Sequence, residues 1–174
     1  VMAVYAKQQL GFPRERVIGM GGSLDSARFR AFIAEELNVS VKDVSGVVLG
    51  NHGDAMMPVV RTATVGTTPL IDLLPMEKIN AIVARTKQAG AEIGGHLKTG
   101  SAFFAPSRGA IEMAEAILKD QKRIIPCAVE LNGEFGVNDK LMVGVLCQLG
   151  GAGMEKIIPF KMSDLNLFKN KKRN

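Results

Sequence analysis

The sequence has 174 residues, of which 47% are hydrophobic and 22% are charged. This length and composition predict one globular domain with a substantial core and exclude a disordered or fibrous chain. The apolar runs fall short of the roughly 20 residues that a membrane-spanning helix needs, and "VMAVYAKQQL" at the start lacks a signal-peptide pattern. We therefore expect a cytoplasmic protein with no membrane partner.

The formal net charge of +5 raises the question of nucleic-acid binding. Four of the cations lie in the last six residues, "KNKKRN", and the others are interspersed with acids. Aromatic residues make up only 5% of the chain, and no basic stripe alternates with residues that could stack on bases. The charge therefore predicts a solvated tail and no nucleic-acid partner.

The two cysteines, Cys127 and Cys147, each lie in an apolar run that is typical of a strand. Neither has a second cysteine or a histidine nearby at the spacing of a zinc site. We expect two buried thiols and no metal site.

The predicted elements begin with a helix at residues 4–10, a turn and a short strand, "VIGMGG", that ends in glycines. A second helix is expected from Leu24 through "LDSARFRAFIAEEL", because its apolar residues recur at three- and four-residue spacings. After the turn "NVSVKD", the apolar residues 47–49 predict a short buried strand. This strand opens into a glycine-containing loop that carries His52.

The second half of the sequence predicts two helices and then three strands. After a strand at "VVRTATV", Pro69 is expected to open a long helix, which Gly94 and Gly95 should break or kink. A further helix is expected at residues 107–119. The residues predicted to share its apolar side are Ile111, Ala114, Ile117 and Leu118. Strands within "IIPCAVEL", "LMVGVLCQL" and "MEKIIPF" are joined by turn sequences and predict an antiparallel meander.

These elements predict a mixed α/β fold, in which helices pack against a twisted, largely antiparallel sheet. No internal repeat or linker divides the chain, so we expect one domain over residues 1–174. The stretch "GMGGSL" begins like a dinucleotide-binding loop, but Leu24 stands where the third glycine would be required. We therefore expect no phosphate-binding loop for a nucleotide in this chain.

His52 stands where a predicted buried strand ends, a position at which catalytic groups are commonly found. An imidazole titrates near neutral pH, so it can accept or donate a proton there. A histidine that is hydrogen-bonded into a turn explains the same position equally well. The choice between these interpretations depends on residues elsewhere in the chain.

Asp25 and Arg28 lie three residues apart, which puts a carboxylate and a guanidinium on one face of the second predicted helix. The two could simply pair with each other. In the functional interpretation each has a separate partner: Arg28 binds a substrate carboxylate, and Asp25 accepts a hydrogen bond from His52.

In "GFPRERVIGMGGSLDSARFRAFIAEELNVSVKDV" and "VLGNHGDAMMPVVR" the chain resembles the lactate and malate dehydrogenase family. The combination of "LDSARFR", a strand, "HGD" and a proline is more diagnostic than any one piece. The resemblance continues through "KTGSAFFAPSRGAIEMAEAIL" and "GEFGVND". It implies the carboxyl-terminal, substrate-binding half of such an enzyme, with residues 1–20 as a remnant edge of the dinucleotide-binding domain. The Rossmann NAD domain itself would lie outside this chain.

The resemblance also implies catalytic roles. His52 would accept and donate the proton, Asp25 would orient it, and Arg28 would clamp the 1-carboxylate of the substrate. Leu24 and His52 would contact the nicotinamide of the NAD cofactor.

Several other residues carry weaker predictions. Ser101 and Ala102, in "TGSAFF", resemble the wall of the family's substrate pocket, but close packing explains small residues there equally well. Asp54 is expected to satisfy backbone donors in its loop. His96 lacks a comparable set of partners, and we interpret it as structural.

The stretches "GMGGSLDSARF", "HGDAMMP" and "TGSAFFAP" are most similar to the lactate-dehydrogenase-like malate dehydrogenases of bacteria and archaea. The resemblance therefore implies malate and oxaloacetate as substrates, with lactate as the alternative, and a homodimer or homotetramer. The loop that recognises the far carboxylate, and the residue that separates NAD from NADP, would lie upstream of residue 1. A second hypothesis is that this chain is a non-catalytic module. The 174-residue chain alone is expected to have no enzymatic activity.

Overall fold

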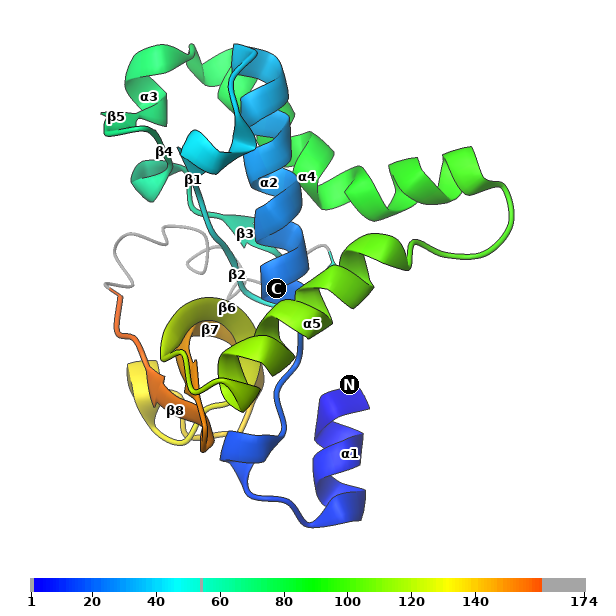
Figure 1. The fold of residues 1–174 in the computed structure, drawn as a ribbon, viewed down its shortest axis with the longest axis vertical. Helices are drawn as coiled ribbons and strands as arrows, with labels where there is room; N and C mark the ends of the chain where they lie inside the picture. The colour runs from blue at the N-terminus through cyan, green and yellow to red at the C-terminus, as the bar shows by residue number, and fades with distance from the viewer. Residues whose placement is uncertain (1, 54, 161–174) are drawn as a thin grey trace, which may run out of the picture.

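The computed structural model describes residues 2–53 and 55–160 as helices, short 3-10 turns and antiparallel strands. Figure 1 shows the long helix α2 (Gly21–Leu37) upright in the upper half with α4 (Met76–Leu97) beside it, and α5 (Phe104–Leu118) next to the sheet in the lower half. The shorter helices are α1 (Met2–Leu10) and α3 (Leu70–Leu73). The 3-10 turns are Arg14–Arg16, Val41–Asp43, Val60–Thr62 and Glu134–Gly136.

The described strands form three separate antiparallel sheets. The largest joins β6 (Arg123–Glu130), β7 (Met142–Gly150) and β8 (Gly153–Ile157) in chain order. The other two are built from two-residue strands: β1 (Val44–Ser45), β2 (Val48–Leu49), β3 (Met57–Pro58), β4 (Thr64–Val65) and β5 (Thr68–Pro69). The predicted mixed α/β fold and the predicted meander are therefore confirmed.

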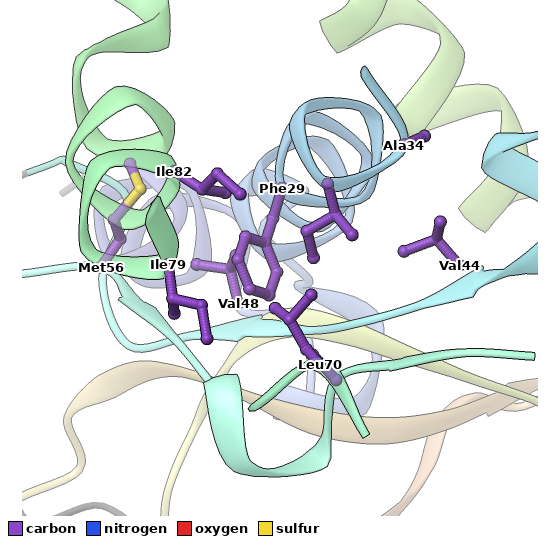
Figure 2. Close-up of a cluster of buried hydrophobic side chains, with 10 residues drawn as sticks. Phe29, Ala34, Val44, Val48, Met56, Leu70, Ile79 and Ile82 are labelled. Carbon is purple, nitrogen blue, oxygen red and sulfur yellow. The ribbon is translucent and has the colours of Figure 1, made fainter. Parts of the chain in front are cut away.

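The first core lies on one side of α2. Phe29 and Ile33 of this helix are fully buried against Leu70 and Ile79, which come from α3 and α4. Figure 2 shows Phe29 surrounded by residues from both helices and from β2. Val48 of the two-residue strand β2 therefore packs against α2 in addition to pairing with β3.

A second core fills the space between α5 and the β6–β8 sheet. Cys127 and Cys147 are both fully buried in it as free thiols, which confirms the prediction for them. The predicted apolar face of α5 is only partly correct: Ile117 packs against this core, but Ile111 is 55% exposed and Leu118 is 84% exposed, whereas Gly109, Met113 and Ala116 are buried. Gly109 lies against Met20 and Ser23, where a Cβ atom would come within 3.0 Å of Sδ of Met20.

Three other element predictions need correction. "VIGMGG" forms only a single bridge, between Gly19 and Ala128, and α2 already begins at Gly21. "VVRTATV" is mainly a 3-10 turn, with a strand only at its end. The long helix breaks at Pro75, and Gly94 and Gly95 lie inside α4. The break has a clear cause, because a proline disfavours helical geometry in the residue before it.

Helix α1, near the start of the chain, contains no buried residue. The prediction that residues 1–20 are the edge of another domain stays a prediction. The predicted solvated tail falls outside the described residues. Among the helices in the described ranges, none combines the length and the apolar character that crossing a membrane requires.

Candidate active site

The candidate site is centred on Asp25, in the second turn of α2, and His52, in the loop after β2. The Nδ1 atom of His52 lies 2.6 Å from Oδ2 of Asp25. Only 1% of Asp25 is exposed, whereas the side chain of His52 is 53% exposed. The pair therefore has a buried carboxylate end and an imidazole end that solvent or a ligand can reach.

This geometry determines how the imidazole can act. A carboxylate can only accept a hydrogen bond, so the proton of this contact lies on Nδ1. In the neutral ring, Nε2 then carries the lone pair and can accept a proton. His52 therefore has the arrangement of a general base whose tautomer is selected by a buried anion.

Burial raises the pKa of the Asp25 carboxyl, while the hydrogen bond from His52, the charge of His52 and the charge of Arg28 oppose that rise. The desolvation of a buried carboxylate outweighs the help from its two neighbours. The charged form of Asp25 is thus maintained at a cost in stability.

Arg28 lies one helical turn after Asp25 and is 9% exposed. Its Nη1 atom is 3.6 Å from Oδ1 of Asp25, which makes an ion pair but is too long for a hydrogen bond. Within the described ranges, Nε of Arg28 and Oδ1 of Asp25 are buried without a hydrogen-bond partner. Asp25 therefore contacts both Arg28 and His52, and Nε of Arg28 remains available as a donor, while the substrate-binding role of Arg28 stays a prediction.

Three glycines allow the segments around His52 to lie close together. A Cβ atom on Gly21 would lie 2.8 Å from Cβ of His52, so any larger residue would push the imidazole away. Gly50 has φ +81° and donates its N–H to the carbonyl of Gly144 at 2.8 Å. A Cβ atom on Gly144 would overlap the carbonyl oxygen of Gly50. Sequence reasoning missed Gly21 and Gly144, because a close approach between distant segments leaves no local signal.

A second arginine on the same helix provides a contrast. The Nη1 atom of Arg30 donates to the carbonyl of Gly46 at 3.3 Å, and burial lowers the pKa of its guanidinium. Arg30 borders a polar cleft of about 260 Å³ that also contains Glu112 and Arg123, which form an ion pair at 2.9 Å. Arg30 therefore has an assigned protein partner, unlike the Nε group of Arg28.

The remaining predicted residues lie in different surroundings. Leu24 is 4% exposed and directly precedes Asp25. Ser101 is exposed and Ala102 half-buried, in the loop between α4 and α5 that extends to the right in Figure 1. Ser101 makes no hydrogen bond to the Asp25–His52 pair in the described structure, and its pocket role stays a prediction. His96 is exposed in the last turn of α4.

Asp54 lies outside the described residues, so its predicted role in the loop stays untested. No group of three or more histidine, cysteine, aspartate or glutamate side chains that could hold a metal ion occurs in the described ranges.

Comparisons with known proteins find malate and lactate dehydrogenases. The malate dehydrogenase of Chlorobium limicola is 53% identical over 167 residues, covering 96% of this chain and 54% of the relative. The crystal structure of Cryptosporidium parvum malate dehydrogenase superposes with a TM-score of 0.90 at 42% identity, covering 94% of this chain and 53% of that one. A lactate dehydrogenase from the same organism, complexed with lactic acid and β-nicotinamide adenine dinucleotide, gives a TM-score of 0.88 at 38% identity, covering 95% and 56%.

The chain spans about half the length of the relatives that it matches. Residues 22–172 match the family model for the lactate/malate dehydrogenase α/β C-terminal domain. This match covers the helix with Asp25 and Arg28, the loop with His52 and the whole meander. The chain therefore belongs to the lactate/malate dehydrogenase family.

Proposed function

We propose that this chain supplies the substrate-binding half of an NAD-dependent malate dehydrogenase. The observation that carries the proposal is the buried Arg28, whose Nε lacks a hydrogen-bond partner in the described structure, one helical turn from the Asp25–His52 pair. A guanidinium can bind a carboxylate through two parallel hydrogen bonds. A 2-hydroxy acid offers that carboxylate next to the hydroxyl that a general base must deprotonate.

Each side chain then has one task. Arg28 binds the 1-carboxylate of malate, which presents the C2 hydroxyl to Nε2 of His52. Neutral His52 accepts the hydroxyl proton during oxidation, and the protonated ring returns it to the carbonyl of oxaloacetate during reduction. Asp25 stabilises the imidazolium and keeps the proton on Nδ1.

The residues present suit the nicotinamide end of NAD. The half-exposed imidazole of His52 leaves room for a ligand beside the ring, whereas Leu24, one position before Asp25, is apolar but only 4% exposed. When bound, NAD supplies the acceptor for the hydride that leaves C2. Leu24 and His52 are the residues of this chain that would contact it.

Lactate is the second candidate substrate, because lactate dehydrogenases also match the fold with a TM-score of 0.88. Malate is favoured because curated relatives named malate dehydrogenase reach 53% and 55% identity. Ser101 and Ala102 would form part of the pocket wall that makes this distinction.

Assembly into a homodimer or homotetramer is also part of the proposal. The outer face of α5 supports it, because Phe104, Ile111 and Leu118 are large apolar side chains that are more than half exposed. Light scattering on the purified protein measures the number of subunits, and a monomer at micromolar concentration would contradict this part of the proposal.

The test of the function joins this chain to the amino-terminal part of the Chlorobium limicola malate dehydrogenase, which lies outside the matched region. The chimera should oxidise NADH in the presence of oxaloacetate and should prefer oxaloacetate to pyruvate in kcat/KM. The 174-residue chain alone, verified at 18.6 kDa by mass, should show no turnover. A folded chimera without activity toward either substrate would contradict the proposal.

A further inference from the structure

The buried hydroxyl of Ser26, one residue after Asp25, links the two elements that carry the site. Ser26 is fully buried in α2. Its Oγ donates to the carbonyl of Gly22 at 2.7 Å and accepts from the backbone N–H of Val48 at 2.8 Å. The first bond stays inside the helix, whereas the second connects α2 to the first residue of β2.

The N–H of Val48 has its partner on the helix because of the register of β2 and β3. Val48 faces Pro58 across this pair, and the neighbouring cross-strand bond runs from the N–H of Val59 to the carbonyl of Val47. Alternate residues of an antiparallel strand turn their N–H groups away from the partner strand. The N–H of Val48 therefore points toward α2, where Ser26 accepts it.

This bond lies a short distance along the chain from His52. Between Val48 and His52 the backbone passes through Gly50, and Gly53 follows the histidine with φ +113°. Glycines restrict the backbone least of all residues, so the loop itself specifies little of the position of His52. The position of His52 therefore depends on the fixed points before it, which are the end of β2 that is anchored on α2 and the bond from the Gly50 N–H to the Gly144 carbonyl.

We propose that Ser26 is a positioning residue, whose hydroxyl ties β2 to α2 and thereby holds Nδ1 of His52 against the Asp25 carboxylate. This inference deepens the proposed function and rests on it. Asp25 and Ser26 are consecutive residues of one helix, so the acceptor of the imidazole and the anchor of its strand move together. A shift of β2 along α2 would lengthen the 2.6 Å contact directly.

The test replaces Ser26 with alanine, which favours the helix but leaves the N–H of Val48 buried without a partner. His52 and His96 are the two histidines of the chain, so ¹⁵N-histidine labelling gives an internal reference. In Ser26→Ala the Nδ1 proton of His52 should exchange with water about tenfold faster than in the unchanged protein, whereas the His96 signals should not move.

Kinetics on the chimera provide the second readout. The kcat of Ser26→Ala should fall about tenfold, because the proton acceptor is displaced. The KM should change less than about twofold, because Arg28 stays on the unchanged helix. Ser26→Cys, which keeps a donor and acceptor at this position but forms weaker hydrogen bonds, should give an intermediate exchange rate and kcat.

Thr86 provides the matched control. It is also fully buried in a helix, and its Oγ1 donates to the carbonyl of Ile82 at 2.8 Å, inside α4. Thr86→Val removes a buried hydroxyl of the same kind without loosening β2, so the His52 exchange rate should stay within about twofold of the original.

Three results would overturn the inference. The first is an unchanged exchange rate of the His52 Nδ1 proton in folded Ser26→Ala. The second is an equal increase of that rate in Thr86→Val. The third is the unfolding of both Ser26 variants, which would mean that the hydroxyl supports the fold as a whole. The NMR readout needs no turnover. An inactive chimera whose His52 proton responds as expected would therefore contradict the proposed function and leave the positioning role intact.

Discussion

The α2–β2 region and the β6–β8 sheet of this molecule differ in how fully their buried polar groups are paired. In the sheet, residues from Arg123 to Glu130 each face a partner on β7, and the core beneath is apolar. In the α2–β2 region, the strands are two residues long, and Asp25 and Arg28 keep buried polar atoms without hydrogen-bond partners in the described structure.

This difference indicates a division of labour. A buried polar group without a partner lowers stability, so its retention points to a group that a ligand completes. If the proposed function is right, substitutions of the polar site residues in the α2–β2 region should reduce activity more than stability, and changes in the core beneath the sheet should do the reverse.

The largest expected effect comes from the loss of the general base. In the chimera, His52→Gln should lower kcat by about 10²–10⁴-fold, because glutamine cannot accept the hydroxyl proton. The melting temperature should change little, since the imidazole is half-exposed. His96→Gln, at the exposed end of α4, is the control and should keep normal turnover. If steady-state kinetics give the same kcat for His52→Gln and His96→Gln, then His52 is not the general base.

The sheet should give the opposite result. Leu149→Ala removes a fully buried side chain from β7 and should lower the free energy of unfolding by about 2–5 kcal/mol. Leu141→Ala, at a position that is 51% exposed, should cost less than about 0.5 kcal/mol. Urea denaturation of the 174-residue chain measures both. Equal losses would mean that the second core does not carry the stability of the fold.

The smallest expected effect is the change in melting temperature when Asp25 is replaced by asparagine. Burial raises the pKa of this carboxyl in the folded state, so its contribution to stability is greatest at acid pH and falls as the pH rises through the folded pKa. Asparagine is neutral throughout. Asp25→Asn should therefore melt at a higher temperature than the unchanged protein near neutral pH, and this advantage should shrink toward acid pH.

The same substitution should reduce turnover, because the imidazolium loses its anion. Oxaloacetate reduction by Asp25→Asn should therefore be slower than by the unchanged chimera. The exposed residue Asp43 gives the control, since Asp43→Asn should change neither the melting curve nor the rate. A melting difference that grows toward acid pH would contradict the direction of the Asp25 pKa.

Much of the sheet and of the candidate site was predictable from the sequence, for physical reasons. The meander was predictable because apolar runs and turn residues are local signals. The candidate pair was predictable because Asp25 and His52 lie in motifs with a strong family resemblance. The close approach at Gly21 was not, because it depends on two segments that are distant in the chain.

The errors elsewhere also have physical causes. Helix α5 has apolar residues on two sides, and sequence alone favours the bulky side with Ile111 and Leu118. The structure buries the other side, where Gly109 lies against Met20. The break at Pro75 was a readable local signal, whereas the 3-10 turn at Val60–Thr62 is set by its tertiary surroundings.

The most direct test of the account is Arg28→Lys in the chimera, with Arg30→Lys as the matched control on the same helix. Lysine keeps the charge but loses the planar pair of donors. If Arg28 clamps the substrate carboxylate, kcat/KM for oxaloacetate should fall about a hundredfold, or roughly 3 kcal/mol of transition-state stabilisation, while Arg30→Lys should stay within about threefold. A folded Arg28→Lys protein with near-normal kcat/KM would contradict the central claim that this arginine binds the substrate.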